Sequence, residues 1–282
     1  MTVLTVIWAL DAVSISEALN TAGQIFLLFG KYCCAFPILA IYFCVRDGFS
    51  LPKKGDVGWL ILSMLFGDIC YFFCEYSALK FLPTATATLC LGVIPGFSYL
   101  TDCVINRQRP KISILLLMIL MILGLAPVVS ASSDFFSGHL LGYLACIGCA
   151  AAWIAYGRVI NRLDRTMSST AITFWQQLFA IIAMSPIALS TIPHDIPLRD
   201  ILICIVAMGI LSNGLGFLIE IRGFIDLGST VTAIYLNVLP VFTAIAGFIF
   251  LHEQMSLLQC IGAAVVIICG CLIILRSTES AA

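Results

Sequence analysis

The stretch 75–97, EYSALKFLPTATATLCLGVIPGF, has a counterpart 145 residues later in the stretch 220–242, EIRGFIDLGSTVTAIYLNVLPVF. The two stretches align without a gap and share six identities in 23 positions. The identical pairs are Glu75 and Glu220, Leu82 and Leu227, Leu91 and Leu236, Val93 and Val238, Pro95 and Pro240, and Phe97 and Phe242. The same offset places Trp8 on Trp153. One ungapped offset that joins tryptophan, glutamate and proline pairs predicts an internal repeat.

The composition indicates the environment in which this repeat folds. Hydrophobic residues make up 61% of the 282 residues and charged residues 10%, with a mean hydropathy of +1.10. Soluble globular chains carry about 25% charged residues, so this chain lacks the charge to cover a water-facing surface. This excludes a soluble enzyme and a disordered protein. The net charge of −1 also offers no basic surface for nucleic acid. The composition therefore predicts a polytopic membrane protein.

Apolar runs separated by polar turns predict ten transmembrane helices, each near the ~20 residues that cross a bilayer. The predicted spans are 2–18, 24–45, 57–79, 84–105, 112–131, 138–158, 169–190, 200–221, 229–250 and 257–275. Two repeats, 1–131 and 138–276, then hold five spans each. Because five is odd, the second repeat enters the membrane from the opposite side. The predicted fold is all-α, with two inverted five-helix repeats. The first helix is expected to be short or incomplete at its start.

Basic residues predict the orientation of these spans. With the N-terminus in the cytoplasm, eleven of the fourteen lysines and arginines lie on the cytoplasmic side. Only Lys31, Lys80 and Arg199 lie on or near the outer side. Cytoplasmic loops of membrane proteins carry such an excess of lysine and arginine. We therefore expect a multi-pass protein of the plasma (inner) membrane with both termini in the cytoplasm.

Several motifs resemble those of EamA-type transporters in the drug/metabolite transporter superfamily. The stretch Ser77–Phe81, SALKF, resembles the family signature at the end of the third span. Further matching positions are Trp8, Lys31, Trp153–Tyr156, Pro240-Val241, Leu251–Glu253 and Ile261–Ala264. The chain departs from the family pattern at Gln108, where the family has glutamate. The resemblance covers nearly the whole chain and implies ten helices and solute transport, often export of amino acids or other small metabolites.

Ionisable groups at membrane depth are rare and are the first candidates for function. Asp68 lies near the middle of the third span, and Glu75 follows seven residues later on the same helix face. Asn213 and Glu220 repeat this arrangement in the second half. These residues predict a solute site at Asp68 and proton coupling at Asp68, Glu75 and Glu220. The alternative is a structural ion pair between Asp68 and Lys31.

Other polar and aromatic residues within the spans extend the predicted site. Trp8 and Asp11 are three residues apart, and Trp153 and Tyr156 repeat that spacing. Tryptophan and tyrosine offer an apolar plate with one polar atom, which suits an amphipathic solute. The candidate substrate-binding residues are Trp8, Asp11, Lys31, Asp68, Trp153, Tyr156, Gln176, Asn213, Tyr235 and Asn237. The alternatives are interfacial aromatic residues and hydrogen bonds between helices.

Pro95 and Pro240 predict matched helix kinks, because proline removes a backbone donor. No metal or cofactor is predicted. Cys146 and Cys149 have the spacing of a redox or zinc motif, but they lie in an apolar helix with no second pair.

The inverted repeat is typical of secondary transporters, which bind solute near the membrane midplane where the repeats meet. We therefore expect no enzymatic activity but transport of a small metabolite, an amino acid or related solute, as an export process by alternating access. One alternative is an intramembrane enzyme acting on lipid or peptide, with Asp68 and Glu75 as acid and base. Another is a channel, although sparse polar residues disfavour a continuous wet pore. The expected partners are the solute and the lipid bilayer. The solute, the coupling ion and a homodimer remain open.

Overall fold

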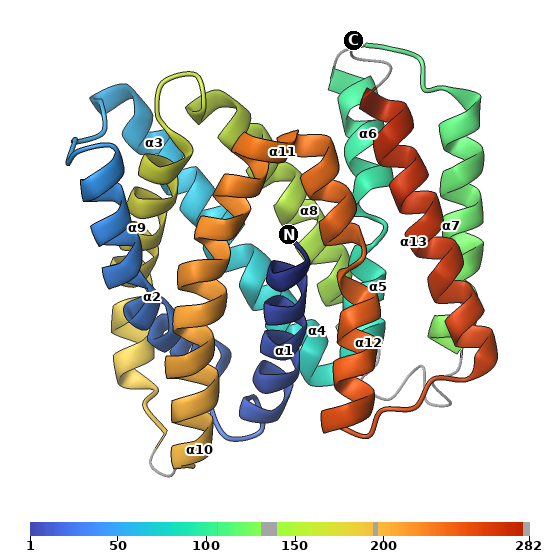
Figure 1. The fold of residues 1–282 in the computed structure, drawn as a ribbon, viewed down its shortest axis with the longest axis horizontal. Helices are drawn as coiled ribbons and strands as arrows, with labels where there is room; N and C mark the ends of the chain where they lie inside the picture. Colours follow the sequence, from blue (N-terminus) through green and yellow to red (C-terminus); the bar gives the residue numbers. More distant parts are fainter. Residues whose placement is uncertain (106, 131–139, 194–196, 279–282) are drawn as a thin grey trace.

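The computed structural model describes residues 1–105, 107–130, 140–193 and 197–278. These residues form helices and no strand (Figure 1). Among the described residues, seven helical stretches are long and apolar enough to cross a membrane, namely Gln24–Arg46, Lys54–Phe81, Thr84–Ile105, Leu140–Leu163, Ser169–Ser190, Leu198–Glu220 and Leu257–Ser277. Two shorter apolar helices are Ile112–Pro127 and Ile234–Phe250. The predicted all-α, multi-pass membrane fold is confirmed.

The helices follow the order of the predicted spans. The first half contains α1 Thr2–Ala18, α2 Gln24–Arg46, α3 Lys54–Ser63, η1 Met64–Cys70, α4 Tyr71–Phe81, α5 Thr84–Leu91, α6 Ile94–Ile105 and α7 Ile112–Ser130. The second half contains α8 Leu140–Leu163, α9 Ser169–Ser190, α10 Leu198–Asp200, η3 Ile201–Ala207, η4 Gly209–Gly216, α11 Phe217–Asn237, α12 Leu239–Phe250 and α13 Leu257–Thr278. The predicted connection between the fifth and sixth spans falls in 131–139, outside the described residues.

One predicted connection is wrong. The segment 222–228 was expected to separate the eighth and ninth spans, but its backbone belongs to α11. It contains no proline, and its residues other than glycine are compatible with a helix. Each of its glycines, Gly223 and Gly228, costs a helix about 1 kcal/mol relative to alanine and does not end it. The helical path therefore continues to Asn237.

Two pairs of helices at equivalent positions in the two halves lie side by side. α7 and α13 pack together on one side of the bundle, and α2 and α9 pack together on the opposite side (Figure 1). Between them α4 packs against α8, and α1 against α12. A buried apolar cluster in the interior joins residues of α1, α2, η1, α4, α5, α8, α9 and η3.

Two π-helical turns, η1 and η4, occupy equivalent positions at the 145-residue offset. A π-turn holds an extra residue and often occurs at functional sites. Asp68 lies in η1 and Asn213 lies in η4. Gly67 lets this turn approach its neighbour, since a Cβ at Gly67 would lie 2.5 Å from Cδ2 of Tyr156. Asp68 and Asn213 therefore both lie in π-turns that pack closely against a neighbouring helix.

Pro95 and Pro240 lie at interruptions of the helical path. Each is the second residue of its helix, α6 and α12. The chain leaves the helix at Gly92–Val93 before the first proline and at Val238 before the second. Proline is tolerated in a first helical turn, where its missing N–H has no helical partner. The expected kinks are thus breaks between two helices.

At one end of the bundle, Glu253 joins the second half to the first. Its carboxylate accepts hydrogen bonds from the backbone N–H of Thr84 at 2.8 Å and from the Thr84 hydroxyl at 2.9 Å. The N–H of Ala85 donates to the same carboxylate at 3.4 Å. Because Thr84 begins α5, Glu253 caps amide groups that a helix N-terminus leaves unpaired.

At the far end of the helical stretch 84–105, Asp102 forms an ion pair with Arg158 of α8. Arg107, which is nearer in sequence, is not its partner. Arg107 lies beyond α6 with a φ of 53°, and its side chain is exposed. Both ends of this stretch, α5 and α6, are therefore tied to the second half.

Candidate functional site

A buried ion pair lies between α1 and α2. The Lys31 ammonium is 2.7 Å from both carboxylate oxygens of Asp11, and it donates to the Tyr76 hydroxyl at 3.4 Å. Lys31 is 1% exposed and Asp11 7% exposed. The suggested pairing of Lys31 with Asp68 is therefore wrong: the partner of Lys31 is Asp11. The pair is electrically neutral, which lowers the penalty for burying both charges.

The second half completes this ion pair through Ser212 of η4. The Ser212 hydroxyl donates to Oδ2 of Asp11 at 2.6 Å. The Trp8 Nε1–H donates to the Ser212 carbonyl at 3.5 Å, and the Trp8 ring meets Phe217 edge-on. η4 reaches this position because Gly209 packs on the backbone of Lys31, where a Cβ would be 2.9 Å from the carbonyl oxygen. Groups from both halves therefore meet at Asp11.

Asp68 lies in a second polar cluster. Its Oδ1 accepts a hydrogen bond from the Tyr32 hydroxyl at 2.6 Å, while its Oδ2 has no partner. The side-chain oxygens of Gln176 and Asn213 also lack partners. All three residues are at least nine-tenths buried, at 2%, 6% and 1% exposed for Asp68, Gln176 and Asn213. Buried polar atoms without partners are uncommon in proteins and call for an explanation.

The two repeat-related glutamates lie near one tyrosine. The Tyr71 hydroxyl donates to Oε1 of Glu75 at 3.5 Å. Tyr71 also interacts electrostatically with both Glu75 and Glu220. Both glutamates are half-buried, and among the described residues neither forms an ion pair with a lysine or arginine. Within the described part of the chain, the site thus contains two carboxylates that form no ion pair with a lysine or arginine.

A row of aromatic rings connects these glutamates to the Asp68 cluster. Tyr71 and Trp153 have ring centroids 5.2 Å apart, and Trp153 and Tyr156 have centroids 5.6 Å apart. The Tyr156 ring lies against Gly67, the residue before Asp68, since a Cβ at Gly67 would lie 2.5 Å from Cδ2 of Tyr156. The predicted residues Trp153 and Tyr156 therefore lie beside the predicted ionisable groups.

Two predicted residues lie apart from this cluster. Tyr235 is 38% exposed. Asn237 donates from Nδ2 to the Ile267 carbonyl at 2.9 Å and packs against Gly270, so it joins α11 to α13. The structure does not bring these two residues to the polar groups of α1, α2 and α4.

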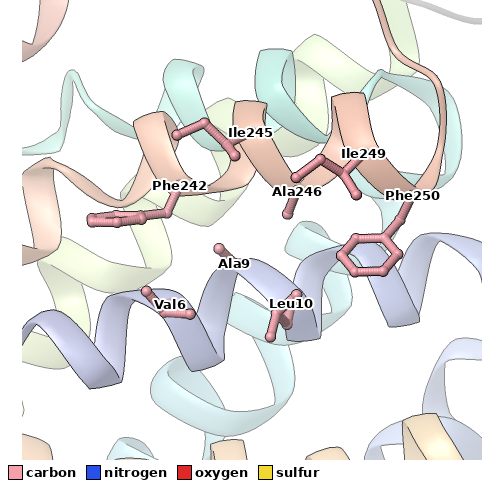
Figure 2. Close-up of a pocket in the computed structure, with 8 residues that line it drawn as sticks. All are labelled: Val6, Ala9, Leu10, Phe242, Ile245, Ala246, Ile249 and Phe250. Carbon is pink, nitrogen blue, oxygen red and sulfur yellow. The ribbon is translucent and has the colours of Figure 1, made fainter.

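A separate pocket lies between α1 and α12 (Figure 2). Every side chain that lines it is apolar: Val6, Ala9, Leu10, Phe242, Ile245, Ala246, Ile249 and Phe250. Figure 2 shows the side chains of the two helices facing one another across it. It holds no side-chain group that could orient a polar solute, so the polar cluster is the better candidate for the functional site.

Sequence reasoning missed three residues that contribute to the cluster: Tyr32, Tyr71 and Ser212. Two of them could have been found. Tyr71 lies three residues after Asp68 and four before Glu75, so helical spacing puts it near both. Ser212 precedes Asn213 within the repeat. Tyr32 follows the candidate Lys31 directly, but neighbouring helix residues point in different directions, so the spacing gave no reason to include it.

Comparisons with known proteins give a consistent result. The model of the EamA-like transporter family matches residues 1–130 and 140–276. An uncharacterized transporter of Archaeoglobus fulgidus is 23% identical over 267 residues, which cover 93% of this chain and 91% of that protein. The pseudopaline exporter CntI of Pseudomonas aeruginosa is 25% identical over 248 residues, 87% of this chain and 84% of the exporter. A solved crystal structure with 19% identity has a TM-score of 0.68 and covers 96% of both chains.

Proposed function

Because the chain belongs to the EamA-like transporter family, we propose that it exports a small metabolite across the plasma membrane by alternating access. The family and the transporters among its relatives make it a transporter and not an enzyme, so the intramembrane-enzyme alternative is set aside. The similarity to a pseudopaline exporter supports outward movement of the solute.

The contact between the halves at Asp11 carries this proposal. Asp11 of the first half accepts from Lys31 of the same half and from Ser212 of the second half. In inverted-repeat transporters the solute site lies where the repeats meet, and rocking of one repeat against the other exposes it to each side in turn. If η4 moved relative to α1, the hydrogen bond from Ser212 to Asp11 would break or change. Movement of the two halves would in this way change the polar groups available at the solute site.

We assign the solute site to the polar and aromatic residues around this contact. Its proposed members are Trp8, Asp11, Lys31, Asp68, Glu75, Trp153, Tyr156, Gln176, Asn213 and Glu220. Tyr235 and Asn237 are left out because one is exposed and the other joins α11 to α13. The proposed repeats are 1–131 and 138–276, each with five spans.

Metabolite export provides the test. Cells that overproduce the protein should accumulate at least one amino acid or related metabolite in the medium, measured by mass spectrometry against cells with an empty vector. Asp68→Asn should reduce this excess without abolishing it, at equal protein level in the membrane. Asp226→Asn is a matched control, because Asp226 is an exposed carboxylate of α11. An unchanged metabolite profile under wild-type overproduction, in both medium and cells, would contradict the proposed function.

We also propose that both termini lie in the cytoplasm. A cytoplasm-active reporter fused after Arg276 should then be active, and a periplasm-active reporter at Asp134 should also be active. Asp134 lies outside the described residues, in the segment between α7 and α8. The reporter activities on the two sides check the ten-span topology, and periplasmic activity at the C-terminus would rule it out.

A further inference from the structure

The two ends of the bundle are held together by different polar contacts. At the end where α10 lies, which is the outer end in the proposed topology, polar contacts join the first half to the second (Figure 1). They include the Glu253 cap on α5, the ion pair of Arg199 with Glu17 at 2.9 Å and the hydrogen bond from the Thr21 hydroxyl to Asp200 at 2.8 Å. The outer end is therefore closed by contacts between the halves.

The internal repeat shows that the inner end cannot form the same contacts. At the 145-residue offset, the equivalent residues are Arg162 for Glu17, Lys54 for Arg199, Gly55 for Asp200 and Gln108 for Glu253. Two cations thus stand where the outer end has an ion pair, and a glycine and an uncharged amide replace two carboxylates. Like charges repel, and a neutral acceptor forms weaker hydrogen bonds than a carboxylate. The closure of the outer end therefore has no counterpart at the equivalent inner positions.

The backbone that receives the cap also differs between the ends. At the outer end Pro83 separates α4 from α5, so the first amides of α5 are available to Glu253. At the inner end the residue equivalent to Pro83 is Gly228, which lies inside α11. Amides inside a helix bond to carbonyls of the same helix. The inner end therefore lacks both the carboxylate, since Gln108 replaces it, and the free amides.

The inner end is held by more exposed contacts. Asp102 and Arg158 form an ion pair there, with side chains that are 50% and 32% exposed. Exposed ion pairs contribute little to stability, because water competes for both charges. Further hydrogen bonds at this end join α2 and the residues after it to α9, which packs along α2 in any case. They are Asp47 with Ser168 and Ser50 with Trp175.

The Glu253 cap is the more protected contact. Thr84, which donates to both carboxylate oxygens, is 0% exposed. Gly247 of α12 leaves the space for this contact, since a Cβ there would lie 2.7 Å from Oε2 of Glu253 and 2.9 Å from Oγ1 of Thr84. Hydrogen bonds to a carboxylate are roughly twice as strong as neutral ones. Glu253, Thr84 and Gly247 together form what we call the outer latch.

We propose that the outer latch keeps the outer end closed, and that the inner end, which lacks such a latch, is the end that opens in the absence of solute. The inference rests on the transport function and topology proposed above, and concerns which side of the membrane the solute site faces at rest. A site that faces the cytoplasm at rest suits export, because the solute is taken up from that side.

The outer latch joins helices that carry proposed solute-site residues. Glu253 follows α12, which packs along α1, the helix of Asp11. Its partner Thr84 begins α5, which packs on α8, the helix of Trp153. A solute held between α1 and α8 therefore lies between the two sides of the latch. Its binding would supply the free energy that releases Glu253 from α5 and opens the outer end.

Distances across each end test the proposal on the full chain in lipid nanodiscs. A ketone-reactive spin label on p-acetylphenylalanine leaves the 13 cysteines untouched. Labels at Lys80 and Gln254 report on the outer end, and labels at Arg109 and Arg165 report on the inner end; all four positions are exposed. Pulsed electron paramagnetic resonance then gives both distance distributions. Without solute, we expect one distance at the outer end and an additional, longer one at the inner end.

Three variants separate the latch from other contacts at the same end. Glu253→Gln removes the charge with little change in shape and should raise the long-distance population at the outer end about fivefold. Gly247→Ala keeps the carboxylate but fills its space, so it should act in the same direction. Glu17→Gln is the matched control, because it removes a carboxylate from an exposed ion pair, and its effect should stay below about twofold.

Two results would overturn the latch proposal. One is an outer distance that neither Glu253→Gln nor Gly247→Ala changes. The other is a wild type without solute whose outer end opens as often as its inner end, and this comparison needs no variant to fold. Either result leaves the transport function intact if wild-type cells export a metabolite. Absence of any exported metabolite contradicts the transport function itself, whatever the distances are.

Discussion

Lys31→Met should destabilise the protein by about 3–5 kcal/mol, the range for breaking a buried ion pair by removing one partner. Among the described residues, the variant leaves the buried Asp11 with the Ser212 hydroxyl as its one side-chain donor. Thermal unfolding in detergent, followed by tryptophan fluorescence, measures the loss. This is the largest stability effect that we expect from a single substitution in the interior.

The double variant Asp11→Asn with Lys31→Met separates charge from packing. It removes both charges and keeps a side-chain oxygen for Ser212, so most of the lost stability should return. Metabolite export by this variant then shows whether the pair has a role beyond stability. We expect the double variant to be stable but inactive in export. A stable double variant that exports at the wild-type rate would show that Asp11 and Lys31 only stabilise the fold.

Asp68→Asn should leave stability nearly unchanged but abolish the dependence of export on external pH. Asparagine keeps an oxygen that can accept the Tyr32 hydroxyl, which donates to Asp68 at 2.6 Å. An asparagine already occupies the equivalent π-turn at Asn213, so the backbone there accommodates an amide. The substitution therefore removes a charge and a transferable proton with little change in shape. Export against external pH, measured for wild type and variant in proteoliposomes, checks the expectation.

Tyr32→Phe is the matched control for Asp68→Asn. It removes the hydrogen bond to Oδ1 and keeps the carboxylate, so pH-dependent export should persist, at an altered rate. If Asp68→Asn and the wild type give identical pH profiles, Asp68 is structural. The functional carboxylates would then have to be Glu75 and Glu220.

Much of the fold could be predicted because lipid solvent imposes simple rules on sequence. Apolar runs of fixed length gave helix starts and ends close to those observed, as in α1 and α9. The error at 222–228 arose because polar and glycine residues were taken to end a helix. Backbone hydrogen bonds in a membrane protein are too costly to leave unmade, so a helix can continue through such residues.

The site could be predicted only in part. Asp11, Lys31 and Asp68 stood out in the sequence because they are ionisable residues within predicted spans. The structure places all three at buried polar contacts. Sequence could not pair them, because the choice between Asp11 and Asp68 as partner of Lys31 depends on how α1, α2 and η1 cross. The 145-residue offset between the repeats also could not distinguish Asn237, which joins α11 to α13, from the residues of the buried polar cluster.

The Glu253 cap has a consequence for how the chain is made. The backbone amides of Thr84 and Ala85 cannot form their hydrogen bonds to Glu253 until that residue, 169 positions after Thr84, has been synthesised. At ~5–20 residues per second of synthesis, the ribosome needs roughly 10–30 s to supply it. During that interval α5 is inserted with its first amides uncapped by their final partner. Formation of the cap at this end of the bundle is therefore a late step in biogenesis. A chain that stops before residue 253 keeps a first half in which the amides of α5 lack this acceptor.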